Sequence, residues 1–146
     1  MYDKILVTLE ATPTDRAIID HVMRLARVMG SRVVLLHVAD GWAARTYGSD
    51  AVSPEIDADK SYLESIRAEF QADGIPTEAE LAYGEPVKQI VRWVHEKGCD
   101  LLAMSTHGHG LIGDIVFGVT ASRVQHGVSV PVLLLRAEQP PKAAVG

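Results

Sequence analysis

The stretch "KILVTLEATPTDRAIIDHVMRLARVMGSRVVLLHV", residues 4–38, changes its hydrophobic periodicity twice. Residues 4–10 and 32–38 are short apolar runs rich in β-branched side chains, which is typical of buried strands. Between them, residues 12–30 carry apolar side chains at steps of three and four, the spacing of one face of a helix. The stretch therefore predicts a strand, a helix and a second strand.

The rest of the chain repeats this alternation. The further predicted elements are helices at 53–74, 85–98 and 113–127 and strands at 76–84, 100–105 and 130–136. We expect Thr12 to cap the first helix and Gly30 to end it. The weak alternation at 76–84 predicts an edge strand. Strands and helices that alternate in this way predict an α/β domain, in which helices cover both faces of a parallel sheet.

Length, charge and cysteine content limit the class of protein. The 146 residues fit one domain, which we expect to span 1–138 with a flexible tail at 139–146. The net charge is −5 and the basic residues are scattered, so we expect no nucleic-acid or membrane partner. The single Cys99 allows no internal disulfide and predicts a buried apolar filler. These features favour a cytoplasmic protein.

A glycine-rich loop follows the predicted strand at 100–105. Residues 108–113 match the pattern G-x-G-x-x-G, but that pattern indicates a dinucleotide site only when it follows the first strand of the fold. Here it follows the fourth strand, and the strand after it ends at Arg136 where an acidic residue is required. The Gly-Lys-Ser/Thr ending of a P-loop is absent as well. Neither nucleotide fingerprint applies to this loop.

Polar side chains in the loop make weak candidates for metal binding or catalysis. His107 and His109 are close together in sequence, but they have no cysteine nearby and only Asp114 as a carboxylate. Ser105 precedes His107 without the G-x-S-x-G elbow of a hydrolase. Anion binding by backbone N–H groups fits better, because glycines expose these groups and a helix beginning near Gly113 adds its positive end.

The sequence also resembles a known family over nearly its whole length. The stretches that carry the resemblance are "KILVTLEATPTDRAIIDHVMRLA", "SRVVLLHV", "GEPVKQIVRWVHEKGCDLLAMSTHG" and "FGVTASRVQHGVSVPVLLLR". They are similar to the universal stress protein family. Its nucleotide-binding members carry Gly-x2-Gly-x9-Gly-Ser/Thr, which falls here on Ser105, Gly108, Gly118 and Val119. Two of these four positions match by residue type.

The resemblance implies a set of nucleotide-binding residues. They are Thr8, Glu10, Val38, Met104, Ser105, His107, Gly108, His109, Gly118, Val119 and Thr120. Glu10 stands where the family places an acidic contact to adenine, usually Asp. Val38 matches an apolar residue whose backbone contacts the base, and Met104 flanks it. His109 stands near the expected phosphates, where the family often has a basic residue.

Two departures bear on the phosphate contacts. Ser105 replaces the first glycine, and its hydroxyl could itself donate to a phosphate. Val119 lacks the hydroxyl that the family pattern places there, and Thr120 carries one a residue later, rotated by about 100° on a helix. A lost hydrogen bond to a charged group weakens binding about ten- to a hundredfold.

The resemblance implies a Rossmann-like fold, an open doubly wound sheet of five parallel strands in the order 3-2-1-4-5 with four helices. It further implies binding of ATP or another adenine nucleotide, with or without Mg²⁺, and a homodimer formed through strand 130–136. The role would be in stress response or signalling through dimer or partner contacts, with slow ATP hydrolysis at most.

Two alternatives stay open. One is a family member that binds no nucleotide and acts as a protein interaction module, which Glu10 and Val119 favour. The other is a weak metal-assisted ATP hydrolase that uses His107, His109 and a carboxylate.

Overall fold

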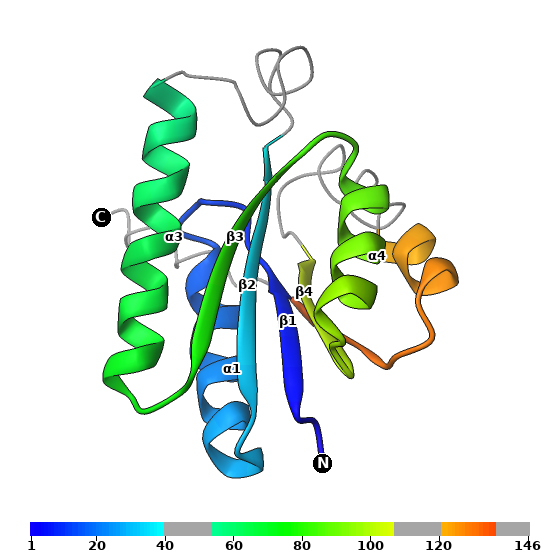
Figure 1. Cartoon of the computed structure of the whole chain (residues 1–146), viewed down its shortest axis with the longest axis horizontal. Coiled ribbons are helices and arrows are strands. Elements are labelled where there is room, and N and C mark those ends of the chain that lie inside the picture. The colour runs from blue at the N-terminus through cyan, green and yellow to red at the C-terminus, as the bar shows by residue number, and fades with distance from the viewer. Residues whose placement is uncertain (40–53, 107–120, 137–146) are drawn as a thin grey trace, which may run out of the picture.

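The computed structural model describes residues 1–39, 54–106 and 121–136. Five strands form one parallel sheet in the order β3-β2-β1-β4-β5 (Figure 1). The strands are β1 (Lys4–Thr8), β2 (Arg32–Ala39), β3 (Thr77–Tyr83), β4 (Leu101–Thr106) and β5 (Val132–Arg136). The helices are α1 (Asp15–Met29), α3 (Pro54–Ala72) and α4 (Pro86–Lys97), and residues 121–127 are also helical. The predicted α/β class, strand order and doubly wound arrangement are confirmed.

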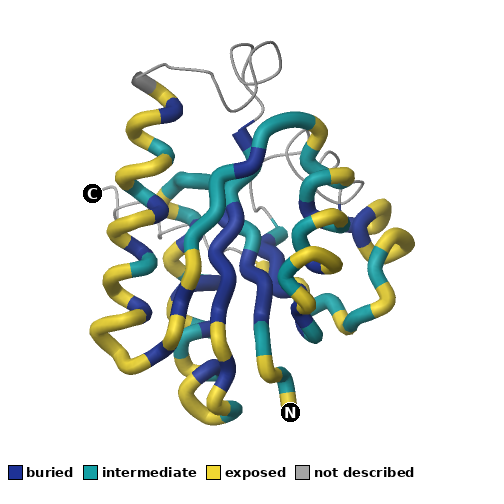
Figure 2. The backbone as a smooth tube through the Cα atoms, viewed as in Figure 1, coloured by how far each residue is buried: buried dark blue, intermediate teal, exposed yellow. Residues whose placement is uncertain are grey.

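Helices cover both faces of the sheet (Figure 1). Ile5 and Val7 of β1 pack with buried residues of α1 and α3 on one face. Leu6, which points the opposite way, packs with Ile90 of α4 and with Val124 on the other face. Figure 2 shows that burial is concentrated along the central strands. The core therefore forms two layers, one on each face of the sheet. Because helices cover both faces, a ligand can reach the sheet only at the ends of its strands.

The turn between β1 and α1 differs from the sequence prediction. α1 begins at Asp15, and Thr12 does not cap it. The Thr12 carbonyl instead accepts the Asp15 N–H at 3.0 Å, while its hydroxyl pairs with that of Thr14. β1 ends at Thr8, earlier than predicted, and the Glu10 N–H is donated to the Asp15 carboxylate. The Asp15 side chain thus binds backbone N–H groups of the turn. The sequence pattern predicts a longer strand and an earlier helix start in this segment.

The other helix ends follow the expected chemistry. Gly30 and Gly98 end α1 and α4 with φ of 68° and 64°, the left-handed conformation that glycine adopts readily. Glu85 lies just before α4, and its carboxylate accepts the N–H groups of Val87 at 3.2 Å and Lys88 at 3.0 Å. The helix predicted at 85–98 is therefore confirmed, with Glu85 as its cap.

The edges of the sheet are β3 and β5. β3 confirms the edge strand predicted at 76–84. β5 begins at Val132 rather than residue 130, because Pro131 has no N–H to donate, although its carbonyl accepts the Leu102 N–H at 3.0 Å. Cys99 is buried in the apolar cluster under α4, as its sequence position predicts. Within the described ranges, no helix is both long and apolar enough to cross a membrane.

Candidate functional site

The order in which strands are added to the sheet reverses between β1 and β4. From β1 the chain proceeds outward to β2 and β3, then crosses back to β4 and β5 on the other side. β1 and β4 pair directly, with Val7 opposite Ala103. In open α/β sheets, ligands bind outside the carboxyl ends of the strands at such a switch point. The residues just after β1 and at the end of β4 therefore form the candidate site.

The structure describes five of the predicted site residues. They are Thr8, Glu10, Val38, Met104 and Ser105. Thr8 ends β1, Glu10 lies in the following turn, and Ser105 lies near the end of β4. The remaining six, namely His107, Gly108, His109, Gly118, Val119 and Thr120, lie outside the described residues. The described part of the chain thus places Thr8, Val38 and Ser105 at or near the carboxyl ends of β1, β2 and β4.

Ser105 is a buried polar residue in this region. Ser105 is 3% exposed, and its Oγ has no hydrogen-bond partner among the described residues. A buried hydroxyl without a partner is destabilising, because it has lost its hydrogen bonds to water. Such an atom at the carboxyl end of a strand calls for a specific explanation.

Two of the predicted base contacts lie over the core. Met104 is 1% exposed and packs within the apolar cluster between the sheet and α4. Val38 is half-buried against the same cluster. The Met104 side chain is therefore part of the core under α4, and Val38 lies on β2, separated from β4 by β1.

Asp15 organises the turn after β1, although the sequence prediction did not assign it a role. It is 1% exposed, and its carboxylate accepts the N–H groups of Glu10 at 3.0 Å, Ala11 at 2.9 Å and Thr12 at 3.4 Å. The spacing Thr12-x-x-Asp15 resembles a capping box, in which an acidic side chain reaches back to an N–H one turn earlier. That spacing was a usable signal for Asp15.

Tyr62 and His37 complete the polar contacts around this turn. The Tyr62 hydroxyl donates to Asp15 Oδ2 at 2.7 Å. Burial, together with this hydrogen bond and the charge of Asp15, raises the pKa of Tyr62 above its ordinary value. His37 contacts the Leu9 carbonyl through Nδ1 at 2.8 Å and Asp59 through Nε2 at 3.2 Å. Because these partners come from distant parts of the chain, the sequence pattern could not predict that Tyr62 and His37 contact this turn.

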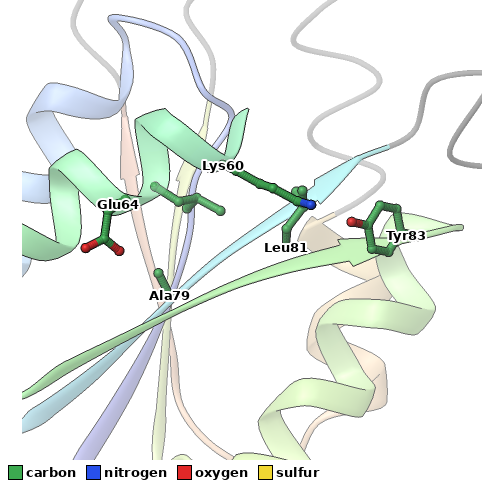
Figure 3. Close-up of a pocket in the computed structure, with 6 residues that line it drawn as sticks. Lys60, Glu64, Ala79, Leu81 and Tyr83 are labelled. Atoms are coloured by element: carbon green, nitrogen blue, oxygen red, sulfur yellow. The ribbon is translucent and has the colours of Figure 1, made fainter. Parts of the chain in front are cut away.

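A groove lies apart from the switch point, between α3 and β3 (Figure 3). It has a volume of ≈ 300 Å³. Its lining residues are Lys60, Leu63, Glu64, Ala79, Leu81 and Tyr83.

In the part of the chain that the structure describes, no group of three or more His, Cys, Asp or Glu side chains could hold a metal ion.

Known proteins share this architecture and sequence pattern. A model of the universal stress protein family matches residues 1–136. Universal stress protein MJ0577 of Methanocaldococcus jannaschii is 24% identical over 155 residues, spanning 93% of this chain and 96% of that protein. The solved structure of MJ0577 has a TM-score of 0.79 and 24% identity, covering 96% of this chain and 99% of that one.

Two further solved structures contain nucleotides. A universal stress protein in complex with cAMP has a TM-score of 0.71 and 17% identity, covering 94% of this chain and 98% of that one. A universal stress protein from Archaeoglobus fulgidus in complex with dAMP has a TM-score of 0.67 and 20% identity, covering 91% of this chain and 97% of that one. With a family model that spans all five strands, the chain belongs to the universal stress protein family.

Proposed function

We propose that this chain binds ATP or a closely related adenine nucleotide, with or without Mg²⁺, at the carboxyl ends of β1 and β4. The observation that carries the proposal is the Ser105 hydroxyl, a buried polar atom with no partner among the described residues at the switch point of the sheet. Relatives with the same fold have been crystallised with cAMP and with dAMP. A phosphate oxygen would give the hydroxyl the acceptor that it lacks.

Each side of the proposed site has a distinct task. Glu10 accepts a hydrogen bond from the exocyclic amino group of adenine, and the backbone at Thr8 and Val38 lies beside the base. Ser105 donates to a phosphate. The glycines and histidines of 107–120 surround the phosphate tail, an assignment that rests on the family pattern in the sequence. The nucleotide in turn regulates dimer or partner contacts in a stress response.

Two buried serines provide a matched test. Ser105→Ala removes the hydroxyl without a partner, so we expect unchanged or slightly higher stability and ATP binding about ten- to a hundredfold weaker. Ser31 is also buried, at 2% exposure, but its hydroxyl donates to the Tyr2 carbonyl far from the switch point. Ser31→Ala should therefore lower stability by about 1 kcal/mol and leave ATP affinity unchanged. Calorimetric titration and urea unfolding measure both effects, and equal ATP affinity in Ser105→Ala and wild type would refute the phosphate contact.

We also propose a homodimer through β5. Of the two edge strands, β3 carries charged side chains that discourage pairing with another strand, whereas β5 exposes an apolar side chain. On β3, Glu80 and Glu78 face Lys97 with N···O distances of 3.2 and 3.6 Å, and charged side chains on an edge strand discourage pairing. On β5, Leu134 is 38% exposed. Pairing of β5 with its copy about a two-fold axis would cover both edges. The same surface would serve the alternative of a protein interaction module without nucleotide.

A further inference from the structure

A single carboxylate holds the turn that carries the proposed base contact. Asp15 accepts the N–H groups of three consecutive residues, Glu10, Ala11 and Thr12, at 3.0, 2.9 and 3.4 Å. Ala11 has a φ of 61°, in the left-handed region that alanine seldom adopts. Successive N–H groups directed at one point form a nest, a backbone arrangement that binds anions. Here the anion in the nest is the protein's own Asp15.

The helix α3 reaches this turn through two residues one helical turn apart. The Tyr62 hydroxyl donates to the carboxylate of Asp15 at 2.7 Å. Asp59 contacts Nε2 of His37 at 3.2 Å, and Nδ1 of the same ring contacts the Leu9 carbonyl at 2.8 Å. The His37 ring thus lies between a backbone carbonyl of this segment and a carboxylate of α3. Helix α3 thus has two polar links to the segment that follows β1.

We propose that Asp15 and Tyr62 are positioning residues for base recognition, acting through Glu10. Asp15 fixes the backbone of Glu10 by accepting its N–H, and Tyr62 fixes the Asp15 carboxylate. The inference rests on the proposed nucleotide site.

The occupied nest has a second consequence within this proposal. Because the Asp15 carboxylate fills the nest, it repels a phosphate from the turn after β1. The phosphate tail is left with the β4 side of the switch point, where Ser105 lies. Asp15 therefore sets the orientation of the nucleotide as well as the position of Glu10.

Adenine and guanine differ in the group that Glu10 would meet. Adenine presents the N6 amino donor, whereas guanine presents the O6 acceptor, which a carboxylate repels. A correctly placed Glu10 therefore favours ATP over GTP. A turn that moves loses this preference, while a fold that is merely less stable keeps it.

The test compares two variants, each of which loses one tyrosine hydroxyl. Tyr62→Phe breaks the bond to Asp15. Tyr83→Phe is the matched control, because Tyr83 lies on β3 in the groove beside α3 (Figure 3) and has no hydrogen bond to residues 9–12 within the described ranges. Calorimetric titration of each folded variant with ATP and with GTP gives the selectivity. We expect Tyr62→Phe to lower the ATP-to-GTP affinity ratio about fivefold or more, and Tyr83→Phe to leave it unchanged.

A double-mutant cycle shows whether the effect passes through Glu10. Glu10→Gln alone should lower the selectivity, because an amide can donate to O6 of guanine as well as accept from adenine. In the Glu10→Gln background, Tyr62→Phe should then have no further effect on selectivity. Hydrogen exchange at the amides of residues 10–12 should be faster in Tyr62→Phe and in Asp15→Asn than in wild type.

The outcomes separate this inference from the proposed function. If wild type binds ATP and Tyr62→Phe behaves like Tyr83→Phe, the positioning role is overturned and the nucleotide site stands. An additive loss of selectivity in the Glu10→Gln background also overturns it, since Tyr62 would then act elsewhere. If wild type binds no adenine nucleotide, the proposed function fails and the positioning role fails with it.

Discussion

The thiol of Cys99 lies in the apolar cluster under α4 and is 5% exposed. Burial raises its pKa to about 11, so very little thiolate is present near neutral pH. We expect Cys99 to react at least about tenfold more slowly with a disulfide reagent at pH 8 in the native protein than in urea, where the thiol regains its ordinary pKa. The absorbance of the released thiol measures both rates. Equal rates in the two states would contradict the burial of this residue.

Some residues around the candidate site could be predicted from the sequence and others could not. Ser105 and Glu10 were predicted as site residues from the family pattern, whose positions recur at fixed spacing in the sequence. Asp15 could have been found from its capping-box spacing to Thr12. Tyr62 could not, because the bond between Tyr62 and Asp15 exists only after α3 has packed beside α1.

A hydrogen-bonded carboxylate joins the amino-terminal ends of β1 and β4, at the opposite ends of these strands from the candidate site. Asp100, just before β4, accepts the N–H of Asp3 at 2.8 Å and of Lys4 at 3.0 Å. Burial acts to raise the pKa of Asp100, but these backbone hydrogen bonds prevail and lower it below its ordinary value. The carboxylate thus links the first residues of β1 to β4.

This link makes a pH-dependent contribution to stability. A carboxyl group with a lowered pKa stabilises the folded state above its ordinary pKa, near 3.9, and loses that contribution as the pH falls through the folded value. Asp100→Asn should lower the free energy of unfolding by about 1 kcal/mol at pH 7, a figure kept small because the group is partly exposed to solvent. The difference should shrink as the pH approaches 3.

Urea unfolding from pH 7 to pH 3 measures this effect. Asp20→Asn is the control, because Asp20 forms an exposed ion pair with Arg16 and should change stability little at any pH. A deficit in Asp100→Asn that does not vary with pH would show that the ionised carboxylate is not its source.

Most elements of the fold could be predicted because their signals are local. Apolar periodicity gave the strands and helices, and Gly30 and Gly98 gave helix ends. The boundaries that differed at β1 and α1 were decided by Asp15, whose carboxylate accepts N–H groups of the turn before it. Asp15 withdraws the Glu10 N–H from the sheet, and this shortens β1 and delays α1.

In the homodimer proposed above, the two copies meet at the exposed edge of β5. Leu134 is exposed there, whereas its neighbours Leu133 and Leu135 pack against the core. Leu134→Lys should therefore keep the fold while placing a charge in the proposed dimer interface. We expect sedimentation of a dimer for wild type and of a folded monomer for this variant.

The control for assembly is Val28→Lys, a similar substitution on α1, where Val28 is 80% exposed. This variant should sediment as wild type does. A wild-type monomer at micromolar concentration would refute the dimer, and a dimer unchanged in Leu134→Lys would place the interface elsewhere.

The proposed binding of an adenine nucleotide at the carboxyl ends of β1 and β4 underlies the other predictions for the site. Calorimetric titration of the folded wild-type chain with ATP and Mg²⁺ tests it most directly, with inorganic triphosphate as a ligand that lacks the base. We expect saturable binding of about one ATP per chain, and triphosphate binding weaker by about tenfold or more. Absence of saturable ATP binding, or equal affinity for ATP and triphosphate, would contradict it.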